Sequence, residues 1–191
     1  MIARVRSRRM RVWAGFVLAM ASMMPLPRPV QSGAVDNAWE LPPLILPDIH
    51  GQEHSLHEWA GRVILLNFWA TWCRPCRIEI PELIAFQESY GPLGLQVVSV
   101  GIDDQRKLRN YARSIGINYP VLVTGTTAGR ELLRRWGNRA GVLPFTVVIA
   151  QDGHLVFMRE GIFDREALET YVLPLLQGQR APDPGTVARD P

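Results

Sequence analysis

The stretch NFWATWCRPCRIEIPEL, Asn67 to Leu83, contains both cysteines of the 191-residue chain, Cys73 and Cys76. It begins inside a continuous apolar run over residues 63–69, as expected for a buried strand of a parallel sheet. The residues after Cys73 have the spacing of a helix, which we expect over residues 74–90. The two cysteines therefore fall at the junction of a buried strand and a helix.

Four explanations can account for the pair Cys73 and Cys76. A structural disulfide closing so short a loop would stabilise the fold by only about 2 kcal/mol. A structural zinc ion would need further ligands, and the four histidines do not have finger-like spacing. Two unrelated buried thiols are a third explanation. A redox-active dithiol is the fourth, and a Cys-x-x-Cys pair beside a strand–helix pattern favours it.

The position of the pair explains how it could react. A thiolate attacks disulfides, and unpaired N–H groups at a helix N-terminus stabilise a negative sulfur. Arg74 adds a positive charge, and Pro75 fits the first helical turn because its missing N–H costs nothing there. We therefore expect Cys73 to be the attacking sulfur. Cys76, almost one turn later, would be the buried resolving sulfur.

The rest of the chain alternates between strands and helices. We expect further strands over 95–103, 119–123, 145–150 and 154–160, and helices over 104–115, 129–136 and 164–176. The last two strands flank Asp152-Gly153, a strong hairpin signal. This order predicts an α/β fold with a central mixed sheet and helices on both of its faces.

The positive charge of the chain is concentrated at its N-terminus. Six arginines and no acidic residue precede Val35, and removing these six from the 21 basic residues leaves 15 against 18 acidic ones. The body of the protein is thus mildly acidic and has no basic stripe with interleaved aromatic residues. This excludes nucleic acid as the expected partner.

The N-terminus has the pattern of an export signal. Arginines precede an apolar run over residues 12–24, which has about the length of a signal-peptide core and is short of a full membrane span. Small residues suited to cleavage occur at 19–21 and 32–34. We predict an exported, periplasmic protein, with the run either cleaved or kept as an anchor in the inner membrane; this run would be its only membrane contact.

The motif WCRPC after NFWAT, followed by Pro81, resembles the thioredoxin superfamily. The longer run VILLNFWATWCRPCRIEIPEL is similar to its exported branch, the TlpA-like and ResA-like thiol–disulfide oxidoreductases, and the resemblance extends from about Leu41 to Leu176. It implies a thioredoxin-like fold with an N-terminal extension. The expected organisation is a signal or anchor with a tether over 1–34, a thioredoxin-like domain over 35–177 and a disordered tail over 178–191.

The resemblance also implies roles for four residues outside the pair. Pro81 matches the proline that kinks the family's helix, and it should break an otherwise long helix. Pro144 matches the family's cis-proline, whereas the residues alone would predict an ordinary trans proline. The cis bond would expose the backbone of Leu143 to an extended client chain. Trp72 matches a surface aromatic that contacts partner proteins; Trp69 is the better core residue. The predicted client-binding surface consists of Trp72, Arg74, Pro75, Leu143 and Pro144.

Two positions depart from the cytosolic thioredoxin pattern. Asn67 stands where those proteins have a buried aspartate, and an amide cannot accept the proton of Cys76. Glu79, three residues after Cys76 on the same helical face, can replace it as general base if burial raises its pKa. The alternative is a solvated glutamate on a helix face. Arg74 between the cysteines should favour the Cys73 thiolate and make the couple more oxidising than a glutamate at this position would.

These residues predict an exported thiol–disulfide oxidoreductase without a cofactor or a metal, acting as a reductant. The resemblance implies a membrane thiol carrier of the CcdA or DsbD type as electron donor. Its expected clients are apocytochrome c disulfides or copper-chaperone cysteines, which would place it in cytochrome c maturation or copper-site assembly.

A disulfide-forming or isomerising enzyme is the alternative within the reaction class. A copper-binding carrier is the alternative outside it. A peroxidase is disfavoured, because such relatives use a lone cysteine after a Pro-rich loop. The histidines, expected to be solvated loop residues, receive no role.

Overall fold

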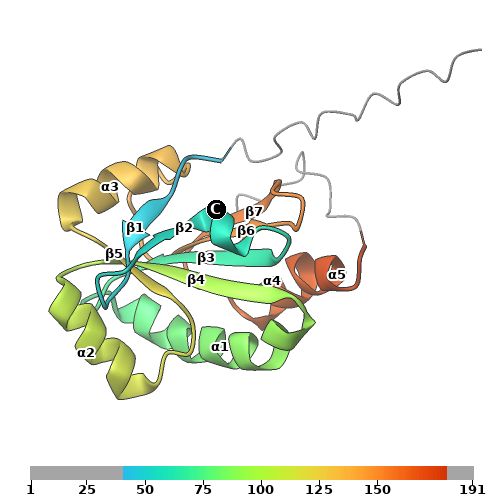
Figure 1. Cartoon of the computed structure of the whole chain (residues 1–191), viewed down its shortest axis with the longest axis horizontal. Coiled ribbons are helices and arrows are strands. Elements are labelled where there is room, and N and C mark those ends of the chain that lie inside the picture. The colour runs from blue at the N-terminus through green and yellow to red at the C-terminus, as the bar shows by residue number, and fades with distance from the viewer. Residues whose placement is uncertain (1–40, 180–191) are drawn as a thin grey trace, which may run out of the picture. The chain divides into compact units, whose positions relative to one another are not determined.

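The structure is a computed structural model that describes residues 41–179 (Figure 1). The predicted signal or anchor, its apolar run over 12–24, and all but the first two residues of the predicted tail lie outside the described residues.

The described chain alternates strands and helices in the predicted order. Its strands are β1 (Ile45–Pro47), β2 (Glu53–Ser55), β3 (Val63–Trp69), β4 (Leu95–Ile102), β5 (Val121–Thr124), β6 (Phe145–Ile149) and β7 (Leu155–Glu160). Its α-helices are α1 (Arg74–Tyr90), α2 (Gln105–Ile115), α3 (Thr126–Arg135), α4 (Arg165–Tyr171) and α5 (Leu173–Leu176). Two short 3-10 helices, η1 (Leu56–Trp59) and η2 (Gly91–Leu93), complete the set.

Five strands form one mixed sheet in the order β5-β4-β3-β6-β7. β3 pairs parallel with β4 and antiparallel with β6, so it lies in the centre of the sheet. All seven of its residues are buried, which explains its continuous apolar sequence. The predicted mixed sheet is confirmed, and the hairpin of β6 and β7 is antiparallel as expected.

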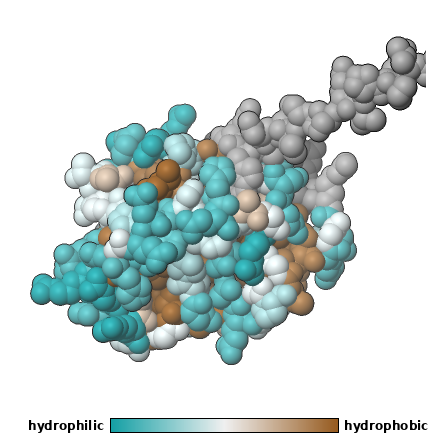
Figure 2. All heavy atoms as spheres, in the orientation of Figure 1, coloured by the Kyte–Doolittle hydropathy of each residue, from teal (hydrophilic) through white to brown (hydrophobic). Residues whose placement is uncertain are grey.

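Helices cover both faces of this sheet (Figure 1). Leu83 and Phe86 of α1 pack with Leu168 of α4 against the face that carries Leu65. Leu132 and Leu133 of α3 pack on the opposite face, together with the apolar residues that flank the β1–β2 hairpin. Central strands therefore have a core on each side. On the face of the molecule drawn in Figure 2, the surface is largely hydrophilic, with smaller apolar patches.

The bounds of two helices differ from the prediction, whereas α1 spans the predicted residues 74–90. Pro81 lies inside α1 without ending it, so the expectation that it breaks this helix is wrong. α3 begins at Thr126, three residues earlier than expected, directly after Gly125 ends the strand region. The last helix is divided at Val172 into α4 and α5, because Pro174 has no N–H to continue the hydrogen-bond ladder. Asp164 caps α4 as predicted, accepting a hydrogen bond from the Ala167 N–H at 3.0 Å.

Between residues 41 and 179, none of the helices combines the length and apolar character that crossing a membrane requires.

Gly129 shows how closely α3 approaches the sheet. A Cβ atom at this position would lie 2.5 Å from Ile102 Cγ2 and 3.1 Å from Thr124 Cγ2. On an exposed helix face, Gly→Ala would stabilise by up to about 1 kcal/mol. At this contact it must instead move the helix or its neighbours.

We therefore expect Gly129→Ala to lower the free energy of unfolding by about 1–3 kcal/mol, the usual cost of overpacking. Urea denaturation measures the change. Thr127→Ala, at an exposed position of the same helix, is the matched control and should change stability by less than about 0.5 kcal/mol. A Gly129→Ala variant as stable as the parent would contradict this packing.

Candidate functional site

The site begins where the central strand ends. β3 stops at Trp69, and α1 starts at Arg74 with Cys73 as its N-cap residue. The Cys73 sulfur accepts a hydrogen bond from the backbone N–H of Cys76 at 3.2 Å. Pro75 lies in the first turn, where the helix needs no N–H from it. The sulfur of Cys73 therefore occupies the electropositive end of the helix.

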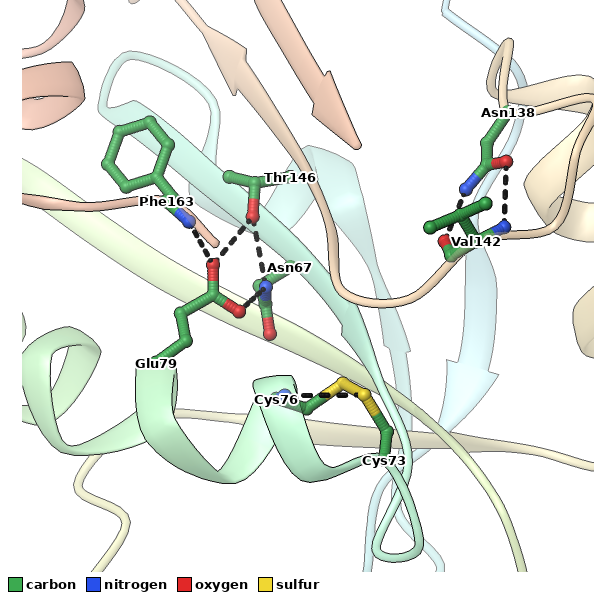
Figure 3. Close-up of a disulfide and its surroundings, with 8 residues drawn as sticks. All are labelled: Asn67, Cys73, Cys76, Glu79, Asn138, Val142, Thr146 and Phe163. Atoms are coloured by element: carbon green, nitrogen blue, oxygen red, sulfur yellow. Dashed lines mark hydrogen bonds between the residues drawn. A yellow bond between two sulfur atoms is a disulfide. The ribbon is translucent and has the colours of Figure 1, made fainter. Parts of the chain in front are cut away.

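The two cysteines form a disulfide with each other (Figure 3). Cys73 retains 5% of its surface and Cys76 is fully buried. Arg74 and Pro75 between them are exposed. An attacking thiol would thus approach the Cys73 sulfur, while Cys76 is shielded.

Glu79 lies on α1, three residues after Cys76 and on the same side of the helix. It is almost completely buried, with 1% of its surface exposed, so the alternative of a solvated glutamate is wrong. The Phe163 backbone N–H donates to Glu79 Oε1 at 2.8 Å, and Asn67 Nδ2 donates to Oε2 at 3.0 Å. The Thr146 hydroxyl donates a longer bond of 3.4 Å to Oε1. Figure 3 shows the carboxylate of Glu79 on α1 and the three donors that point toward it from β3, β6 and the segment after β7.

Burial raises the pKa of Glu79 from its ordinary value of 4.5 to about 7. The hydrogen bonds from Phe163, Asn67 and Thr146 and the charge of Arg159 oppose this, because they favour the ionised form. A carboxyl group with a pKa near 7 can both accept and release a proton at neutral pH, as a general base must. The pKa of the Tyr119 hydroxyl is also raised. Burial is the main cause, and the negative charge of Glu79 adds to it.

A second loop faces the disulfide from the start of β6. The Leu143–Pro144 peptide bond is cis, as the resemblance implied, and Leu143 packs against the apolar cluster that contains both cysteines. Asn138 holds the loop in place (Figure 3): its Nδ2 donates to the Val142 carbonyl at 2.7 Å. Its Oδ1 accepts from the N–H groups of Gly141 and Val142, at 2.7 and 3.2 Å.

Large apolar side chains next to these two loops remain exposed. Trp72 precedes Cys73 and exposes 63% of its surface, whereas Trp69 is fully buried, as expected of the two tryptophans. Val142 beside Leu143 is 44% exposed. Ile162, at 36%, follows Gly161, whose N–H donates to the Pro144 carbonyl at 2.8 Å. Such exposed apolar groups are typical of surfaces that bind other proteins.

The structure tests the expectation that the histidines are solvated loop residues. His54 is not the solvated loop residue that we expected: it lies in β2, hydrogen-bonds Glu58 at 2.8 Å and stacks on Trp59 with ring centroids 5.9 Å apart. His154 is exposed, as expected. Within residues 41–179, no three His, Cys, Asp or Glu side chains form a group that could hold a metal ion.

Sequence reasoning found the cysteines, Glu79 and Pro144, but not the residues that hold them. Asn138 had no signal apart from its place in a Gly-containing loop. Asn67 was noticed only as a missing acid, although its amide donates to both Glu79 and Thr146. The contribution of Phe163 comes from its backbone, which no residue pattern encodes.

Comparisons with known proteins find relatives of this chain. The family model described as "AhpC/TSA family" matches residues 39–158. The "Thiol-disulfide oxidoreductase ResA" of Bacillus thuringiensis (strain Al Hakam) is 28% identical over 134 residues, which cover 70% of this chain and 75% of that protein.

Two solved structures share the fold. The thiol:disulfide interchange protein of the thioredoxin family from Chlorobium tepidum TLS is 26% identical with a TM-score of 0.62, over 71% of this chain and 94% of that one. A secreted thiol-disulfide isomerase from Corynebacterium glutamicum is 22% identical with a TM-score of 0.60, over 72% and 85%. The second likeness supports the fold alone.

The buried Glu79 makes stability depend on pH. Its pKa is about 7 in the folded protein against 4.5 for an unperturbed carboxyl group, so its contribution is present below pH 4.5 and is lost as pH rises through 7. At about 1.4 kcal/mol per pKa unit, the loss is on the order of 3 kcal/mol. We expect Glu79→Gln to abolish this decline in urea unfolding of the oxidised protein between pH 4.5 and pH 8.

The exposed Glu82, on the same helix, provides the matched control. Glu82→Gln should leave the decline of stability with pH as it is in the parent. Parallel pH profiles for the parent and Glu79→Gln would contradict the raised pKa.

Proposed function

The chain belongs to the AhpC/TSA family and is a thiol–disulfide oxidoreductase of the ResA type, and from this premise we propose that it is an exported reductant of protein disulfides. Cys73 is its nucleophile, Cys76 its resolving cysteine and Glu79 its general base. The observation that carries the proposal is the capping of α1 by the Cys73 sulfur, with the N–H of Cys76 donating to it.

The reaction consists of two exchanges between sulfur atoms. The Cys73 thiolate attacks one sulfur of a client disulfide, forms a mixed disulfide with it and releases the other client sulfur as a thiolate, which takes up a proton. Glu79 then accepts the proton of the Cys76 thiol. The Cys76 thiolate attacks the Cys73 sulfur, forms the intramolecular disulfide and releases the second client thiolate. The client gains two electrons and the dithiol loses two.

Client binding is assigned to the two loops that meet at the disulfide. Trp72, Arg74 and Pro75 form one side, and Leu143 and Pro144 the other. The exposure of Trp72 and the position of Leu143 against the cysteine cluster support this assignment. An extended client segment would pair with the Leu143 backbone and place its disulfide over Cys73.

The proposed direction of electron flow, toward client disulfides, requires an external supply of electrons. The export pattern of residues 1–34 supports a periplasmic protein, anchored if the run over 12–24 is retained. In an oxidising compartment a dithiol stays reduced only when electrons are supplied, and a membrane thiol carrier of the CcdA or DsbD type is the proposed donor. The proposed clients are apocytochrome c or copper-chaperone cysteines, in cytochrome c maturation or copper-site assembly.

Trapping tests the proposed chemistry. Cys76→Ala removes the resolving thiol, so client proteins should accumulate as mixed disulfides on Cys73, visible in non-reducing gels and released by a reductant. Cys73→Ala, which keeps one thiol but removes the nucleophile, is the matched control and should trap nothing. If Cys76→Ala captures no client and cells lacking the protein make normal cytochromes, the proposed function is wrong.

Alkylation of the thiols in living cells tests the direction. A reductant should be recovered mostly with Cys73 and Cys76 reduced. Mostly oxidised cysteines would instead identify the protein as disulfide-forming. Stoichiometric copper binding by the reduced protein, without reduction of insulin disulfides, would identify a copper carrier.

A further inference from the structure

One buried polar atom beside the disulfide is not used by the network around Glu79. Asn67 is fully buried in the central strand, and its Oδ1 has no hydrogen-bond partner among residues 41–179. Buried polar atoms are nearly always paired, and a single unpaired one costs about 1–3 kcal/mol. A buried, unpaired acceptor such as Asn67 Oδ1 therefore calls for a functional explanation.

The orientation of this oxygen is fixed by the other half of the same amide. Asn67 Nδ2 donates to Glu79 Oε2 at 3.0 Å and to Thr146 Oγ1 at 2.9 Å. Exchanging the oxygen and nitrogen positions would turn an acceptor toward the Glu79 carboxylate, so the network selects the observed orientation. In Figure 3 the oxygen consequently points away from Glu79 and toward the part of α1 that holds the cysteine pair.

Neighbouring donors do not reach this oxygen. Thr146 and Ser99 are in register with Asn67 on the two adjacent strands, so their side chains share its face of the sheet. The Thr146 hydroxyl donates to Glu79, and the Ser99 hydroxyl donates to the Pro120 carbonyl at 3.4 Å. The indole N–H of Trp69, on the same strand, is itself without a partner among residues 41–179 and does not bond to Asn67.

Reduction of the disulfide creates a new donor here. Two electrons break the S–S bond and give two thiolates. Cys73 stays ionised at the helix end, and Cys76 takes up one proton and becomes a thiol. Its S–H group is a hydrogen-bond donor that the disulfide lacked. Cys76 is fully buried, so few acceptors are available to it.

We propose that Asn67 Oδ1 accepts the hydrogen bond of the Cys76 thiol in the reduced protein. Asn67 then joins the resolving thiol to Glu79, with its oxygen toward Cys76 and its nitrogen toward the carboxylate. An aspartate could not do this, because a carboxylate has no donor for Glu79. The bond exists only in the dithiol, so Asn67 stabilises the reduced form over the disulfide. The inference rests on the proposed function, since it deepens the role of the same dithiol.

Infrared spectroscopy of the S–H group tests the contact directly. Because the chain has only two cysteines, Cys73→Ser leaves Cys76 as the sole thiol and the S–H stretching band is unambiguous. We expect a hydrogen-bonded band in Cys73→Ser, and a sharper band at higher frequency when Asn67→Leu is added. Thr146→Val, which alters the same network but keeps Oδ1, should retain the hydrogen-bonded band.

An identical band with and without Asn67→Leu would overturn the proposal. If the leucine variant does not fold, Asn67→Val removes the same oxygen with a residue suited to a strand. A second measurement is the equilibrium with glutathione in the two-cysteine protein. Asn67→Leu should shift it toward the disulfide on the order of fivefold, the effect of one ordinary hydrogen bond. The same shift should occur in a Glu79→Gln background; a shift that disappears there means that Asn67 acts only through Glu79, which overturns the proposal.

The experiments distinguish failure of the Asn67–Cys76 contact from failure of the proposed function. An unchanged S–H band with client trapping by Cys76→Ala intact refutes the Asn67 contact alone. A shifted band without any trapped client refutes the proposed function and leaves the contact standing.

Discussion

The start of α1 at the end of β3 is the constraint on which the site depends. β3 is held on both sides by neighbouring strands and on both faces by apolar cores, so its last residue is fixed in space. The helix must begin within a few residues of that point, and its first unpaired N–H groups need an acceptor. The Cys73 sulfur serves as that acceptor, which ties the proposed nucleophile to the end of the buried central strand.

A carboxyl group buried beneath the cysteines adds a second constraint. Glu79 receives donors from β3, from β6 and from the backbone that follows β7, so two strands and one loop segment determine its position. The hydrogen-bond donors stabilise the ionised form of Glu79 and so lower its pKa, while burial raises that pKa more strongly, to about 7. The same core that stabilises the protein thus raises the proton affinity of Glu79, the proposed general base.

Much of the fold was predictable because its signals are local. The buried strand, the Cys-x-x-Cys pair at the helix start and the Asp152-Gly153 hairpin are each encoded within a few residues. The partners of Glu79 were not predictable, since Thr146 and Phe163 lie 67 and 84 residues away along the chain. The helix through Pro81 and the division at Val172 were also missed, because tertiary packing decides whether a proline bends, interrupts or merely occupies a helix. The cis bond at Pro144 followed from the family resemblance and not from the residues alone.

The central claim is that the helix end turns Cys73 into a thiolate near neutral pH, and the rate of its alkylation as a function of pH measures this directly. In reduced protein carrying Cys76→Ala, Cys73 is the only thiol, and its reaction with iodoacetamide follows the thiolate fraction. The account predicts a midpoint clearly below about 8.5, the pKa of free cysteine. A midpoint at or above that value would show that the helix end does not activate the sulfur, and the account would be wrong.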